Sequence, residues 1–183
     1  MLIFIAVITI STWYLKNEIN RELLFNQKIT TGSPDFFLKN FFSKQTKENG
    51  DLKFTLSGKK MENFKHLNLT KINQPEYFEY KNKKKNVKIN GDLGEIKNNG
   101  DKIIIKNNVI LSRLPDKNNK LLTLYTNKIT ILTNDEIVYT DLPVKIIQEP
   151  NIEISGTGMQ YEKKEAKFKL LKNAKVYYEK PQK

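Results

Sequence analysis

The chain has 183 residues, of which 38% are hydrophobic, no cysteine, and a formal net charge of +12. This length fits one domain with a short appendage, and the lack of cysteine excludes a disulfide framework and a thiolate metal site. Arginine occurs only at Arg21 and Arg113, so the charge is almost all lysine. It therefore favours a solvated surface over a dedicated polyanion site, which would use arginine forks.

The first segment, Met1–Leu15, has no charged side chain and ends in Trp13 and Tyr14, which favour a membrane interface. As a helix it spans about 22 Å, less than a hydrocarbon core of about 30 Å. A signal peptide and a buried core helix are alternatives, but the segment has no small-residue cleavage site and no basic leader. We predict a transmembrane signal anchor over residues 1–16.

The orientation of this anchor is left open by charge. Lys16, Arg21 and Lys28 follow the span and would place that side in the cytoplasm. A large translocated β domain requires the opposite orientation, with a cytoplasmic N-terminus, and this is the one that we predict. The helical pattern of Asn17–Phe25 and the turn-forming residues of Thr30–Pro34 predict a stalk and linker over 17–34.

Residues 35–183 are predicted to form one β domain with little helix. It begins with the aromatic-rich Asp35–Phe42, and Asn49-Gly50 predicts a tight turn before a segment in which Leu52, Phe54 and Leu56 alternate with polar residues. Asn73–Pro75 breaks the chain before Phe78 and Tyr80, and Lys81–Asn86 predicts a charged hairpin tip.

The alternation is clearest in Asp101–Arg113, where Asn107-Asn108 interrupts it. Short strands are then predicted at 122–125, 129–131, 137–139, 144–146, 152–154, 168–170 and 176–178. Gly156-Thr157-Gly158 has no helix after it, so it predicts a bend or bulge and not a phosphate loop.

Four stretches share a layout in which a polar break precedes a short alternating strand. They are 69–80, 102–113, 136–147 and 166–178. Aligning Glu76, Val109, Val144 and Val176 gives spacings of 33, 35 and 32 residues. Such a period indicates stacked β units, each leaving its apolar face to its neighbours, and excludes a helical solenoid.

No catalytic group of residues is visible. His66 is the single histidine, and Asp92, Asp101, Glu136 and Glu153 are scattered at predicted turns and strand ends. We therefore predict no enzyme activity, no metal site and no cofactor.

The order of these features resembles the LptC family of lipopolysaccharide export proteins. The resemblance rests on the anchor, on Pro34-Asp35 with its aromatic run, on Asn49-Gly50 followed by Leu-x-Phe-x-Leu, and on the late Gly156-x-Gly158-Met159. It covers the chain to about Tyr178. A glycine that some members have before the late strand pair is absent, because that region reads Gln148-Glu149-Pro150.

The resemblance implies an all-β fold, a half-open twisted β-jellyroll of antiparallel strand units behind one transmembrane helix. The protein would be single-pass in the inner membrane of a Gram-negative cell, with its domain in the periplasm. Its partners would be lipopolysaccharide, an inner-membrane ABC transporter and a periplasmic bridge protein like LptA. It would accept lipopolysaccharide from the transporter and pass it to the bridge protein, as part of outer-membrane biogenesis.

An apolar slot between the sheets would hold the acyl chains. Its candidate lining residues are Phe54, Leu56, Phe78, Tyr80, Ile103, Ile105, Val109, Leu111, Ile129, Ile131, Val144, Ile146, Ile154, Phe168, Leu170 and Val176. The transporter-side edge would include Asp35, Phe36, Phe37 and Gly50, and the bridge-side edge Phe168, Leu170, Val176 and Tyr178.

Other functions stay open. A membrane-anchored structural or adhesive β module would have a closed core and take up no lipid. A polyanion binder would need its basic residues clustered on one face with aromatic residues, whereas here lysine lies along nearly every turn.

Overall fold

The computed structural model describes residues 32–117, 119–165 and 167–178. A compact unit begins at Asp35. Its strands are β1 (Phe36–Thr46), β2 (Leu52–Phe64), β3 (Leu69–Asn73), β4 (Glu76–Lys81), β5 (Lys84–Asn90), β6 (Leu93–Lys97), β7 (Lys102–Arg113), β8 (Leu122–Leu132), β9 (Ile137–Gln148), β10 (Ile152–Glu162) and β11 (Lys167–Tyr178). Short 3-10 turns lie at Lys65–Leu67 and Asn98–Gly100.

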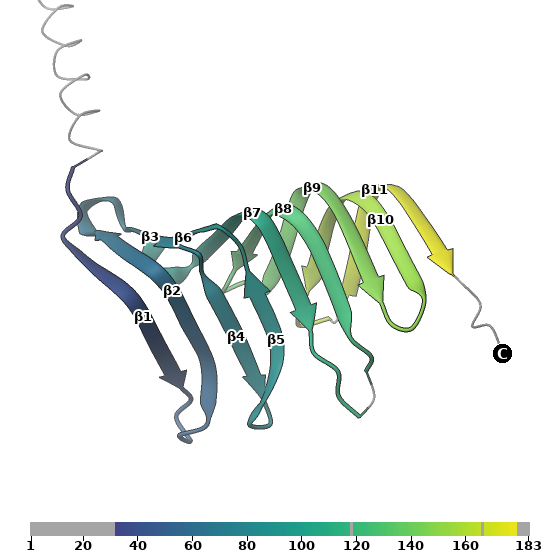
Figure 1. Cartoon of the computed structure of the whole chain (residues 1–183), viewed down its shortest axis with the longest axis horizontal. Coiled ribbons are helices and arrows are strands. Elements are labelled where there is room, and N and C mark those ends of the chain that lie inside the picture. Colours follow the sequence, from purple (N-terminus) through teal and green to yellow (C-terminus); the bar gives the residue numbers. More distant parts are fainter. Residues whose placement is uncertain (1–31, 118, 166, 179–183) are drawn as a thin grey trace, which may run out of the picture. The chain divides into compact units, whose positions relative to one another are not determined.

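All of these strands belong to one antiparallel sheet, in which β11 and β1 are the two edges (Figure 1). β1 pairs with β2, and from β7 onward each strand pairs with the next one in sequence. This confirms the prediction of an all-β antiparallel fold.

Two pairs of short strands lie between the long strands β2 and β7. β2 pairs with β4 through Phe54–Ser57 and with β3 through Lys60–Phe64. β4 then pairs with β5 and β3 with β6, and both β5 and β6 pair with β7. The pair β4–β5 therefore lies between one half of β2 and one half of β7, and the pair β3–β6 lies between the other halves. The break between the two pairs lies midway along the long strands.

The long strands bend along this same line. Positive φ angles occur at Asn40 in β1, Asn107 and Asn108 in β7, Gly158 in β10, and Asn173 in β11. Asparagine and glycine tolerate this backbone region better than other residues do. Except at Asn40, the pairing registers shift next to these residues, so the bends of neighbouring strands line up across the sheet.

The bend divides the sheet into two walls whose inner faces meet. Wall A consists of 41–46, 52–57, β4, β5, 109–113, 122–126, 144–148, 152–157 and 175–178. Wall B consists of 36–39, 60–64, β3, β6, 102–106, 128–132, 137–140, 159–162 and 167–170. We call the space between their inner faces the slot.

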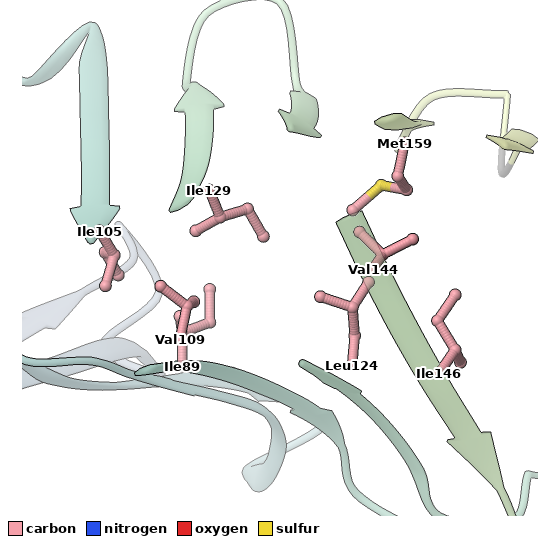
Figure 2. Close-up of a cluster of buried hydrophobic side chains, with 8 residues drawn as sticks. All are labelled: Ile89, Ile105, Val109, Leu124, Ile129, Val144, Ile146 and Met159. Carbon is pink, nitrogen blue, oxygen red and sulfur yellow. The ribbon is translucent and has the colours of Figure 1, made fainter. Parts of the chain in front are cut away.

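The core fills the slot where it adjoins the bend. Figure 2 shows Ile105, Ile129 and Met159 of wall B pointing toward side chains of wall A. The wall A members of this cluster are Ile89, Val109, Leu124, Val144 and Ile146. Ile129 is 0% exposed, and removal of so much apolar surface from water is what holds the walls together here.

Glycine permits the close approach of strands at the bend. A Cβ atom added to Gly91 would lie 2.6 Å from Cγ2 of Ile105, and one added to Gly58 would lie 2.8 Å from Cγ2 of Ile72. Both contacts are too short for any side chain. Glycine at these two positions therefore lets neighbouring strands approach closely where the sheet bends.

The repeat in the sequence corresponds to a repeat of strands in the sheet. Its units correspond to β7, β9, β11 and the short strands β3 and β4, which are alternate strands of the sheet. The period of about 33 residues is thus one hairpin of two bent strands, and the polar break within each unit marks the bend.

Candidate lipid-binding slot and partner edges

A row of inner-face residues crosses wall A from one sheet edge to the other. The strand registers place them side by side, as Ser43, Leu56, Tyr77, Ile89, Leu111, Leu124, Ile146, Ile154 and Val176. Except for Ser43 on β1, every member is apolar or aromatic. Because side chains of one parity share a face of a sheet, this row forms a continuous apolar surface.

Wall B carries a matching row on its inner face. In register order it contains Phe36, Asn63, Thr70, Ile96, Ile103, Ile131, Val138, Tyr161 and Phe168. Only Asn63 and Thr70 are polar, and the amide of Asn63 donates to the Thr70 hydroxyl at 2.8 Å. The slot is thus apolar on both sides along most of its length.

Ten of the residues predicted to line the slot lie in or against the buried cluster. Ile105, Val109, Ile129, Val144 and Ile146 are members of it. Ile103, Leu111, Ile131, Ile154 and Leu170 are partly exposed and pack against it. They lie in the slot, whereas contact with lipid stays a prediction.

The four aromatic and aliphatic candidates on β2 and β4 divide between the two faces. Leu56 is on the inner face opposite Tyr77, and the Phe54 ring lies 5.4 Å from the Tyr77 ring. Phe78 instead lies on the outer face, where Nζ of Lys85 is 3.8 Å from its ring centre. Tyr80 shares that face by alternation along β4. We therefore leave Phe78 and Tyr80 out of the proposed lipid contacts.

Some inner-face residues are absent from the predicted lining set. Ile89, Leu124 and Met159 belong to the cluster, and Tyr77 and Tyr161 pack against it. Ile89 alternates with Val87, and Leu124 alternates with Leu122, so the sequence pattern could have identified both as inner-face residues. No comparable signal marked Tyr77, because Tyr77 and Phe78 are adjacent aromatic residues that face opposite ways.

The C-terminal edge presents unpartnered apolar residues. Phe168 is 43% exposed, Val176 66% and Tyr178 65%. All three are on the inner face, since Phe168 pairs with Tyr161, Val176 with Ile154 and Tyr178 with Ile152. Their exposure arises because β11 has β10 on one side and, among the described residues, no strand on the other. The apolar rows therefore run out to an open edge.

The N-terminal edge has a similar character. Phe36 on the inner face and Phe37 on the outer face of β1 are both exposed. Asp35 fixes the start of the strand, because its backbone N–H donates to the Asn63 carbonyl at 2.8 Å and its carboxylate accepts from the Lys65 backbone N–H at 2.7 Å. Gly50, with a φ of +82°, lies in the predicted tight turn, where its N–H donates to the Lys47 carbonyl at 3.0 Å.

Much of the lysine lies on the outer faces, in ion pairs between adjacent strands. Lys88 contacts Glu76 at 2.6 Å and Lys145 contacts Glu153 at 2.9 Å. Although burial raises the pKa of Glu95, hydrogen bonds and charge from Lys106 and Lys97 outweigh it and lower that pKa below its usual value. This pattern fits a solvated surface better than a polyanion site.

The inner face of wall A has one strongly perturbed group. Burial, and secondarily the negative charge of Glu79, raise the pKa of Tyr77 far above its ordinary value. Tyr77 is therefore a neutral hydroxyl at any physiological pH, compatible with an apolar slot.

Two hollows lie on the surface, and the smaller one is lined in part by the inner-face residues Asn63, Thr70 and Ile96 of wall B. One of about 440 Å³ adjoins Ile110, Tyr125 and Lys145 on the outer side of the bend, and one of about 260 Å³ adjoins Asn63, Lys65 and Asn68 near the tips of wall B. Among the described residues, no group of three or more His, Cys, Asp or Glu side chains is placed to hold a metal ion. Nor does any helix in the described ranges have the length and apolar character to cross a membrane, and the anchor predicted over 1–16 lies outside them.

Comparison with solved structures identifies the fold. The chain is similar to LptH of Pseudomonas aeruginosa, described as the LptA-homologous periplasmic component of the conserved lipopolysaccharide transport device. The TM-score is 0.57 at 11% sequence identity, with 69% of this chain and 95% of LptH covered. The chain thus has the β-jellyroll-like fold of that protein. No curated protein sequence matched it.

The sequence itself identifies the family. Residues 1–179 match the family described as lipopolysaccharide-assembly, LptC-related. The chain therefore belongs to the LptC-related family, whose members are non-enzymatic transport components, and the predicted resemblance is confirmed.

Proposed function

We propose that this protein is the inner-membrane-anchored periplasmic component that accepts lipopolysaccharide from an ABC transporter and passes it to a periplasmic bridge protein. The anchor over residues 1–16 would hold its N-terminus in the cytoplasm and its β domain in the periplasm. The observation that carries the proposal is the pair of inner-face rows, which run from the β1 edge to the β11 edge. Family membership and the fold shared with a transport-device component support it.

The apolar rows provide the environment that acyl chains need. Each CH₂ group removed from water contributes about 0.8 kcal/mol, so a few acyl chains supply a large driving force for entry. The chains would lie along the half-buried outer part of the slot, against residues such as Leu111, Ile154 and Tyr161. The phosphates and sugars would stay outside the slot in water.

The two sheet edges would serve as joints. Within the described part of the chain, each edge strand carries backbone N–H and C=O groups with no strand to pair with, and such groups are templates for another strand. A partner strand beside β11 would cover Phe168, Val176 and Tyr178 and continue the slot into the partner. A partner beside β1 would do the same at Phe36 and Phe37.

Photocrosslinking at two adjacent tyrosines tests the proposal. Tyr178 faces the slot and Tyr177 the outer face, and their exposures of 65% and 59% are nearly equal. A benzophenone amino acid would replace one or the other in cells, and irradiated protein would be blotted for lipopolysaccharide. We expect an adduct at position 178 and little at position 177, and in the reconstituted transporter the adduct should require ATP.

Two other crosslinking results would count against a lipid-binding slot. If neither position 178 nor the inner positions Tyr161 and Leu111 formed an adduct, while crosslinks to protein did form, the protein would be a structural module. Equal labelling at positions 177 and 178 would indicate nonspecific contact with lipid and would also count against a slot.

A further inference from the structure

Packing between the walls weakens with distance from the bend. Near the bend, Ile129, Val109 and Ile146 are at most 2% exposed. Farther out, Val87 and Leu122 on wall A and Tyr161 on wall B are only partly buried. The hydrophobic contacts that close the slot at the bend are therefore thinner at its mouth, where the strand tips lie.

One polar contact joins the two walls at this mouth. Nζ of Lys163, in the turn between β10 and β11, donates to a carboxylate oxygen of Glu79 on β4 at 2.9 Å. β4 and β10 are not neighbours in the sheet, since β5, β7, β8 and β9 lie between them in its order. Glu79 belongs to the inner face of wall A and Lys163 to the tips of wall B, so the pair crosses the slot.

Both ends of this contact are held in place. The Glu79 position pairs with Phe54 of β2 and Val87 of β5, which fixes it next to Tyr77. The backbone N–H of Lys163 donates to the Glu136 carbonyl at 3.0 Å, which ties its turn to the turn between β8 and β9. By contrast, Lys88–Glu76 and Lys145–Glu153 connect adjacent strands of a single wall.

We propose that the Glu79–Lys163 ion pair is a latch that holds the mouth of the slot closed until lipid enters. The claim about lipid entry rests on the proposed function. Both side chains are partly exposed, so the attraction is weak and sensitive to salt. A weak contact suits this role, because the walls separate when it breaks while the buried cluster keeps them joined at the bend.

The width of the mouth can be measured without lipopolysaccharide. Because the chain has no cysteine, Lys84→Cys on the tip of wall A and Lys164→Cys on the tip of wall B give two unique labelling sites. The full chain, spin-labelled at both and placed in phosphatidylcholine nanodiscs, would be studied by pulsed electron paramagnetic resonance. Raising KCl to about 1 M, where the screening length is about 3 Å, should shift the distances to longer values.

Charge reversal makes the test specific. Glu79→Lys and Lys163→Glu should each shift the distances to longer values, because like charges then face each other, and the double exchange should restore the original distribution. Glu79→Gln should give a smaller shift in the same direction and serves if a reversed variant fails to fold. Lys145→Glu, which breaks a pair within wall A, is the matched control and should change nothing.

Two results would overturn the latch. One is an unchanged distribution in every variant, and the other is a double exchange as wide as the single variants, which would mean general disruption. Crosslinking at Tyr178 in the same variants separates this proposal from the proposed function. If the distances respond as expected but no lipopolysaccharide adduct forms, the latch stands and the lipid-transport proposal fails.

Discussion

Asparagine allows three of the long strands, β1, β7 and β11, to bend. Asn40, Asn107, Asn108 and Asn173 all have positive φ angles inside strands. For most L-residues the left-handed region is costly because Cβ approaches a carbonyl oxygen, whereas asparagine adopts it more readily. The bend of the sheet is thus built into individual side-chain choices.

Asn107 offers a direct test of this role. Asn107→Val should lower the free energy of unfolding by about 1–2 kcal/mol, because a β-branched residue is forced into the left-handed region. Asn107→Gly should lower the free energy of unfolding much less, since glycine adopts that region freely. Urea unfolding followed by circular dichroism would measure both, and equal losses would show that the side chain, and not the backbone angle, is what counts.

Glu95 should give the domain part of its sensitivity to acid. Its pKa is lowered in the folded state, so its contribution to stability is present above the unfolded pKa and is lost as pH falls through the folded pKa. Glu95→Gln should therefore make the unfolding free energy less dependent on pH on the acid side. Urea unfolding of both proteins from neutral pH down to about 3 would test this, and parallel curves would refute it.

Local sequence could not distinguish a bend from a turn. Asn107-Asn108 and Thr126-Asn127 were predicted to interrupt or separate strands, yet each lies inside one continuous strand, β7 or β8. Asn82 and Lys83, also with positive φ, do form a reversing turn between β4 and β5. Asparagine occurs in both settings, and pairing with distant strands decides which structure forms.

At the scale of elements, alternation predicted the strands well and their faces less well. In β7 the isoleucines Ile103 and Ile105 face the slot as predicted from strict alternation. In β4 aromatic residues occupy both parities, so the pattern could not tell Tyr77 from Phe78. The assignment depends on β5, where Val87 and Ile89 face inward and Lys88 covers Phe78 from outside.

The edge strand β11 should contribute more to association than to stability. Val176 is exposed on the inner face, so Val176→Lys should change the free energy of unfolding by no more than about 0.5 kcal/mol. It should nevertheless weaken binding to a bridge-type partner, because a charge would be buried in the extended slot. Lys175→Glu, at the neighbouring outward position, is the control. Unchanged binding by Val176→Lys would show that the partner does not cover this face.

For the whole molecule, stability should decrease from the bend to the strand tips. The fully buried side chains all lie close to the bend, whereas the ends of both walls are held by partly buried residues. Hydrogen exchange should therefore be slowest for the amides of 103–105, 109–111 and 129–131, and faster at the tips of the same strands. Uniform protection along β7 would contradict a sheet that is held together mainly at its bend.

The hairpin period makes the sheet modular along one direction. Each unit of about 33 residues adds two bent strands with the same cross-section as the pair before it. Duplicating β8 and β9 would lengthen the sheet by about 10 Å, two strand spacings, and leave the terminal strands β1 and β11 unaltered. Gene duplication or design could therefore change the number of strands in such a sheet without changing the length of each strand.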